Sequence, residues 1–166
     1  MRNFLTTSLA TVFTLVYGTS ATATLFDPAI NRRIGADHSL CAAELLDSGV
    51  SREVTATACA QALVPSDLSL CVAKINRLTP IAANDALAAC TRVRRPVEMS
   101  TCVVDIYRRT QETNTPVTVS SPNLILDGCR RSLLPLRFTD CVIGLSQRIN
   151  FANDVALRTC NAAESR

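Results

Sequence analysis

Apolar residues recur along the chain at the spacing of an amphipathic helix, and each run is centred on a cysteine. Relative to Cys41, Cys71, Cys102 and Cys141, the residues at positions −3, 0, +1 and +4 are apolar with one exception, His38. Residues at this spacing lie on one face of an α-helix. The pattern therefore predicts four helices, each with a buried face that contains a cysteine.

A second set of stripes leads up to the other four cysteines. Apolar or small residues stand three and four positions before each of them, and a short polar residue lies further upstream. The side-chain oxygen of such a residue can accept a backbone N–H at the start of a helix. We therefore expect a second helix in each repeat. Its cysteines are Cys59, Cys90, Cys129 and Cys160, and its expected N-caps are Ser51, Asn84, Asn123 and Asn153.

A proline block joins the second helix of one unit to the first helix of the next. Three segments read C-x5-P-x5-C, with Pro65, Pro96 and Pro135 at their midpoints. Proline suits the first turn of a helix, because the N–H that it lacks would have no intrahelical partner there. The first cysteines of successive units are 30, 31 and 39 residues apart, a period that indicates tandem supersecondary units.

This repeat predicts an all-α protein of four tandem helical hairpins with about eight short helices, in a compact solenoid-like stack or a bundle. The units are expected near residues 35–64, 65–95, 96–134 and 135–166. The last interval between units is long because the third unit carries a polar insertion centred on residues 111–121. Insertions into one repeat often carry recognition, since they protrude from a rigid scaffold.

The start of the chain has the features of an export signal. Arg2 precedes an apolar stretch, and Ala21-Thr22-Ala23 has the small-x-small pattern that signal peptidase accepts. We expect a signal peptide at residues 1–23 and a single domain at residues 24–166, periplasmic or extracellular. No later stretch is long and apolar enough to span a bilayer, so we expect no transmembrane segment in the mature chain.

The eight cysteines are expected to form disulfides, because an even number in an exported chain is typical of an oxidised framework. Pairing within each hairpin is favoured, because it leaves no cysteine over. Pairing across the proline turns would explain why the two cysteines of each C-x5-P-x5-C block are always 12 residues apart. It leaves Cys41 and Cys160 unpaired at opposite ends of the chain. Both schemes therefore stay open. The favoured pairs are Cys41–Cys59, Cys71–Cys90, Cys102–Cys129 and Cys141–Cys160.

No catalytic motif is present, and we predict no catalytic residue, no metal site and no cofactor. His38, the only histidine, has no nucleophile and orienting group that can be identified beside it. We therefore expect a non-enzymatic binding or structural module. One alternative is a protein that stores Cu(I) on reduced cysteines, because soft thiolate ligands favour Cu(I). The other is an enzyme with an unrecognised site.

Arginine supplies the candidate binding residues. The chain has 17 basic residues, of which only Lys74 is lysine, and a net charge of +3. Arg94, Arg95, Arg130 and Arg131 follow the second-helix cysteines of adjacent units, so stacked hairpins would bring them to one edge. Guanidinium groups bind carboxylates and phosphates. We expect an unknown protein or an anionic envelope component as the partner, and no nucleic acid, because aromatic residues that stack on bases are few.

Three segments resemble blocks of uncharacterised exported cysteine-repeat proteins of cyanobacteria. The resemblance covers residues 41–160, and its specificity lies in the C-x5-P-x5-C blocks. It implies a periplasmic location and no particular activity. The segments are Leu70-Cys71-Val72, Cys102-Val103-Val104-Asp105-Ile106 and Cys129-Arg130-Arg131-Ser132-Leu133-Leu134-Pro135.

Overall fold

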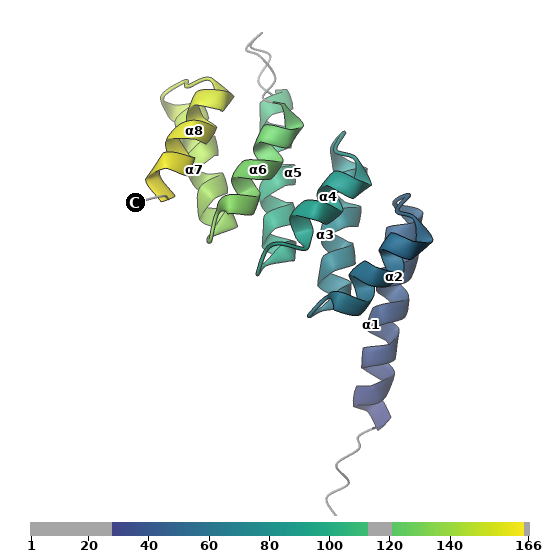
Figure 1. The fold of residues 1–166 in the computed structure, drawn as a ribbon. Coiled ribbons are helices and arrows are strands. Elements are labelled where there is room, and N and C mark those ends of the chain that lie inside the picture. Colours follow the sequence, from purple (N-terminus) through teal and green to yellow (C-terminus); the bar gives the residue numbers. More distant parts are fainter. Residues whose placement is uncertain (1–27, 113–120, 165–166) are drawn as a thin grey trace, which may run out of the picture.

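The computed structural model describes residues 28–112 and 121–164, which form eight helices and, within these ranges, no strand (Figure 1). The expected signal peptide and residues 113–120 of the insertion lie outside the described residues. The helices are α1 (Pro28–Asp47), α2 (Arg52–Gln61), α3 (Pro65–Leu78), α4 (Ala83–Cys90), α5 (Pro96–Glu112), α6 (Pro122–Arg131), α7 (Pro135–Arg148) and α8 (Asn153–Glu164).

The predicted helix starts are confirmed at the proline blocks and wrong at three of the four caps. Helices α3, α5 and α7 each begin at the proline. Ser51 caps α2 by accepting a hydrogen bond from the Val54 N–H at 3.4 Å. The other three expected caps are wrong, because Asn84, Asn123 and Asn153 lie within the first turns of α4, α6 and α8.

The cap of α4 shows why these starts differ. Ala82 occupies the cap position, and its carbonyl oxygen accepts the Ala86 N–H at 3.0 Å, so the helix is already established before Asn84. A side-chain cap contributes only about 1 kcal/mol, which the packing of Ala83, Ala86 and other buried residues of this helix can outweigh. Helix α1 also differs from the expected unit boundary, since it begins at Pro28 rather than near residue 35.

The eight helices form a two-layered open stack (Figure 1). Helices α1, α3, α5 and α7 pack side by side in one layer, and each forms a hairpin with the helix that follows it. In the second layer α4 packs against α6, and α6 packs against α8. Helices α1 and α7 lie at opposite ends of the row, so the fold is a short solenoid rather than a closed bundle.

The predicted apolar stripes form the core between the two layers. Leu68, Met99 and Phe138, which precede a first-helix cysteine by three residues, are all buried. The equivalent residue of the first unit, His38, is exposed. The stripes are therefore the surfaces on which each unit packs against its neighbours.

Polar contacts also join successive first helices, each through the residue three positions after a first-helix cysteine. Ser69 Oγ on α3 donates a hydrogen bond to Glu44 Oε2 on α1 at 2.6 Å. Lys74 Nζ on α3 donates one to Thr101 Oγ1 on α5 at 2.8 Å. Glu44 and Lys74 both stand three residues after a first-helix cysteine. The same helix position therefore links one unit to the next in two successive interfaces.

Candidate functional site at the turn edge

Each hairpin is closed by one disulfide. The Cα–Cα distances of the four bridges lie between 5.9 and 6.2 Å, within the ordinary range. All eight cysteines are paired, so in this state none offers a thiolate to a metal. The pairs follow the within-hairpin scheme: Cys41–Cys59, Cys71–Cys90, Cys102–Cys129 and Cys141–Cys160.

The bridges also bear on the compartment. Disulfides persist in oxidising surroundings, so four of them indicate a protein of an oxidising compartment. Among the described residues, no helix has the length and apolar character needed to cross a bilayer. Over the same ranges, no three His, Cys, Asp or Glu side chains gather as a group that could hold a metal ion.

The candidate binding residues lie on one side of the stack, which we call the turn edge. It comprises the connections at residues 62–64, 91–95 and 132–134 with the adjoining helix ends, and the end of α8. Figure 1 shows these connections along one side of the row, opposite the turns that close the hairpins. The repeat places them there because every proline turn leads from the second layer back to the first.

The four arginines predicted from the sequence all reach this edge, but they differ in their ion pairs. Arg95 Nη1 lies 3.2 Å from Glu98 Oε2 at the start of α5. Arg130 and Arg131 share the Asp127 carboxylate, at 2.5 and 2.8 Å. Arg94, by contrast, makes no ion pair with any described residue. Of these four arginines, the one without an ion pair is therefore in the central turn.

Asp127 is held in its ionised form by the two arginines that it binds. Burial alone would raise the pKa of this carboxyl, but hydrogen bonds from Arg130 and Arg131 and their positive charges outweigh that effect and lower the pKa. The pair of arginines is thus partly neutralised at any pH near neutrality. It also sits at the C-terminus of α6, where cations stabilise the helix dipole.

A recess of about 660 Å³ opens on the turn edge between α2 and α4, and we call it the N recess. The recess exists because α2 and α4 make little contact with each other, and because small side chains such as Ala58 and Ala62 do not fill it. Two charged residues stand at its wall, Asp67 on α3 and Arg94 in the central turn. The remaining wall is largely apolar and includes Leu63, Val64, Leu68 and Val93.

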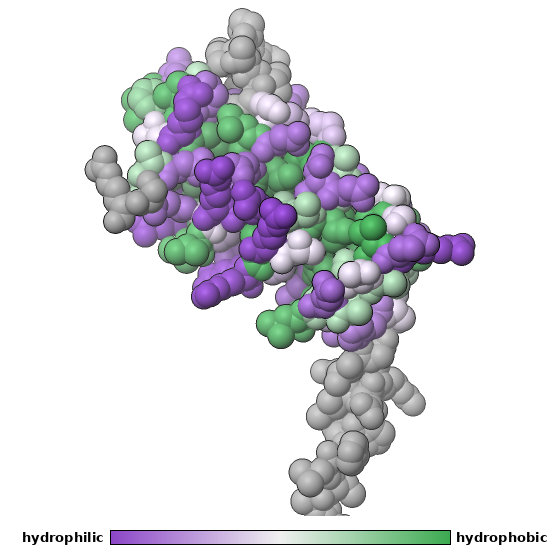
Figure 2. All heavy atoms as spheres, viewed as in Figure 1, coloured by the Kyte–Doolittle hydropathy of each residue, from purple (hydrophilic) through white to green (hydrophobic). Residues whose placement is uncertain are grey.

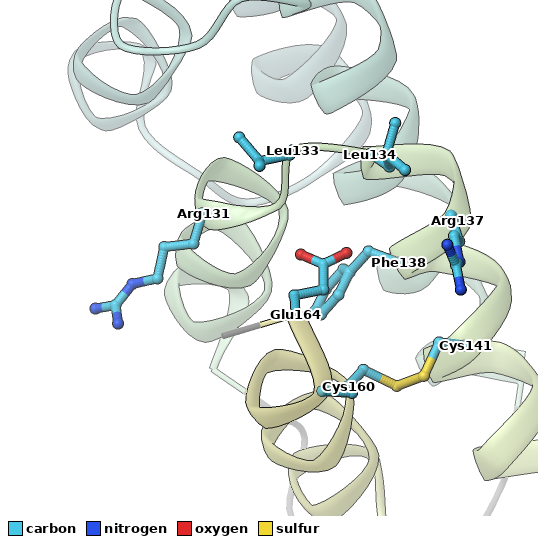
Figure 3. A pocket seen from close by; sticks show the side chains of 9 residues that line it. Arg131, Leu133, Leu134, Arg137, Phe138, Cys141, Cys160 and Glu164 are labelled. Atoms are coloured by element: carbon cyan, nitrogen blue, oxygen red, sulfur yellow. A yellow bond between two sulfur atoms is a disulfide. The ribbon is translucent and has the colours of Figure 1, made fainter. Parts of the chain in front are cut away.

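A second recess of about 390 Å³ lies between the α6–α7 turn and α8, and we call it the C recess (Figure 3). Phe138 and the Cys141–Cys160 bridge form its floor. Glu164 projects into the space between the turn and the bridge, and its Oε1 accepts a hydrogen bond from Ser132 Oγ at 2.8 Å. Arg131 points away from the recess in this view.

The two recesses occupy equivalent places in the repeat, two units apart. Leu63, Val64 and Leu68 of the N recess correspond to Leu133, Leu134 and Phe138 of the C recess, counted from Pro65 and Pro135. Their charged residues are exchanged. Asp67 corresponds to Arg137, and Arg94 corresponds to Glu164, so the two recesses share a place in the repeat but not a charge pattern.

Sequence reasoning missed the exposed leucines of this edge. Leu63 is 100% exposed and Leu133 is 83% exposed, although each lies only two residues before a buried proline. Apolar residues next to a helix start are easily read as part of the core. The available signal was their shared place two residues before the proline, where the central unit has Arg94 instead.

Comparison with known proteins adds nothing to this site, since no family model, no curated protein and no solved structure matches the chain.

Proposed function

We propose that the protein is an exported, non-enzymatic binding module that recognises an anionic partner through the turn edge. The observation that carries this proposal is the charge of that edge. Six arginines lie on it against four carboxylates, and Arg92, Arg94 and Arg137 form no ion pair with the described residues. The arginines are Arg92, Arg94, Arg95, Arg130, Arg131 and Arg137, and the acidic residues are Asp67, Glu98, Asp127 and Glu164.

The disulfides support the proposal by holding the edge rigid. Cys90 is the last residue of α4, directly before the central turn, and Cys129 directly precedes Arg130 and Arg131. Each cysteine is bridged to the neighbouring helix, so the arginines project from anchored helix ends. A preorganised surface loses less conformational entropy when it binds a partner.

Charge reversal on the turn edge tests the proposal. We expect the pair Arg94→Glu and Arg131→Glu to weaken capture of partners from a cell-envelope extract and to flatten the dependence of capture on salt. The matched control reverses Arg77 and Arg148, which are exposed and lie in the last turns of α3 and α7, on the opposite side of the stack. Equal capture by both double variants at low salt would rule out the turn edge as the recognition surface.

The resemblance to exported cysteine-repeat proteins supports a periplasmic site of action. N-terminal sequencing of the exported protein, which we expect to begin near Thr24, tests the export itself. An intact Met1 in that material would contradict it.

A further inference from the structure

The two recesses and the arginines between them define a partner of particular chemistry. We propose that the turn edge binds an acidic protein segment that carries one apolar anchor on each side of its carboxylates. One anchor enters the N recess and the other enters the C recess, while the carboxylates meet Arg94 and Arg95. This inference rests on the proposed function and adds the class of partner to it.

The first argument is the alternation of side chains along the edge. The two residues before each turn proline are Leu63-Val64 in the first turn, Arg94-Arg95 in the second and Leu133-Leu134 in the third. The same two positions of the repeat are thus apolar in the first turn, basic in the second and apolar in the third. Figure 2 agrees with this order: apolar groups protrude at the α2–α3 and α6–α7 turns, and hydrophilic groups lie between them.

The second argument is the shape of the surface beside the leucines. Each apolar pair borders a recess, of about 660 Å³ in one case and about 390 Å³ in the other. A recess of this size receives a side chain of a folded or extended partner, whereas a bilayer presents no side chain to fill it. The central turn has arginines in place of the leucines. A protein segment therefore fits the edge better than a lipid surface does.

The third argument is spacing. Neighbouring helices pack about 8–10 Å apart, so recesses two units apart are separated by roughly 16–20 Å. A helical partner spans this distance with about 11–13 residues at 1.5 Å per residue. An extended partner spans it with about 5–6 residues at roughly 3.3 Å per residue. The anchors of the bound segment should show one of these two separations.

The charges of the recesses limit where the carboxylates of the bound segment can lie. The N recess carries Asp67 opposite Arg94, so its charges balance. The C recess carries Arg137 against Glu164, since Arg131 points away from it and pairs with Asp127, so its charges balance as well. Acidic residues of the partner should accordingly lie between the two anchors, opposite Arg94 and Arg95, rather than within either recess.

A library of random 16-residue peptides displayed on phage, selected on the disulfide-bonded protein, tests the inference. We expect enriched peptides to carry two apolar residues at one of the two separations, with Asp or Glu between them. Gln61→Trp and Ala163→Trp introduce a bulky side chain at an exposed residue that lines the N or the C recess. Each should weaken the selected peptides at least tenfold. Ala60→Trp, exposed on α2 outside the recess lining, is the matched control and should change nothing.

The outcomes separate this inference from the proposed function. If Arg94→Glu with Arg95→Glu abolishes binding but neither recess variant weakens it, the two-anchor inference is overturned and anionic recognition stands. If charge reversal has no effect either, both fail. Vesicles of phosphatidylglycerol and phosphatidylcholine supply the remaining arm. Vesicle binding that Leu63→Ser with Leu133→Ser abolishes, and that the recess variants leave intact, would assign the edge to membranes and overturn the inference.

Discussion

Gly128 on α6 lies directly against the ring of Phe138 on α7. A Cβ atom added to Gly128 would come within 3.0 Å of Phe138 Cζ and 3.1 Å of Cε1. The residue before each second-helix cysteine is otherwise Ala58, Ala89 or Thr159. The smallest residue at this position therefore stands beside the largest of the residues three positions before a first-helix cysteine, since Phe138 takes the place of Leu68 and Met99.

We predict that Gly128→Ala destabilises the protein despite the better helix propensity of alanine. Alanine gains about 1 kcal/mol in a helix interior, but overpacking against a buried ring costs typically 1–3 kcal/mol. The net loss should be about 1 kcal/mol, measured by urea unfolding of the disulfide-bonded protein.

Phe138→Leu provides the control for this prediction, because it restores the pairing of a small residue with an aliphatic one. The double variant should lose less stability than the two single variants combined, as residues in direct contact do not act additively. If Gly128→Ala instead gains the stability that helix propensity alone implies, the prediction is wrong. The Phe138 ring would then shift into the C recess, and the close contact would carry no energetic cost.

The disulfide pairing makes a prediction about cleavage within the insertion. A site for a specific protease introduced at residues 115–117 should yield two fragments that stay together until a reductant is added. The reason is that Cys102–Cys129 spans this segment. Non-reducing electrophoresis detects the joined product. Fragments that separate without reductant would mean that this bridge is absent, as pairing across the proline turns requires.

The state of the thiols decides between a disulfide framework and a Cu(I) store. Because every cysteine is bridged, alkylation under denaturing, non-reducing conditions should leave the mass of the protein unchanged. After reduction, the same treatment should add eight alkyl groups. Several groups added before reduction, in protein isolated without oxidant, would favour the metal-storage alternative.

The helices and their buried faces were predictable from local pattern. Periodic apolar positions such as Ile75 and Val103 can be satisfied only on one face of a helix, and both are buried. Proline marked three helix starts because its ring geometry acts locally. The caps were less predictable, because at Asn84 the preference of one side chain competes with the packing of a whole helix.

The candidate site was only half predictable, because it depends on which residues meet in space. That the arginines lie at one edge could be predicted from their place after Cys90 and Cys129. The recesses could not, since residues that are far apart in the chain, such as Leu133 and Ala163, line the same cavity. Nor does residue spacing alone reveal that the Asp127 carboxylate neutralises two of the predicted arginines.

Asp127 leads to the last prediction, which concerns charge and pH. Because folding lowers the pKa of its carboxyl below the ordinary value of 3.8, the ionised group stabilises the folded state above that pH. That contribution is lost as the pH falls through the lowered pKa. Asp127→Asn should therefore be less stable than the parent protein at pH 7, and the difference should shrink toward pH 3. Urea unfolding midpoints at the two pH values measure it.

The same substitution should strengthen recognition while it weakens the fold. Asp127→Asn releases Arg130 and Arg131 from their shared carboxylate, so affinity for an acidic peptide should rise several-fold at low salt and return to the parent value as salt screens the charges. Asp140→Asn makes the same change in net charge at an exposed residue of α7 that forms no ion pair with the described residues, and serves as the control. If both variants gain equally, the effect comes from net charge alone, and the arginines at the end of α6 take no specific part in binding.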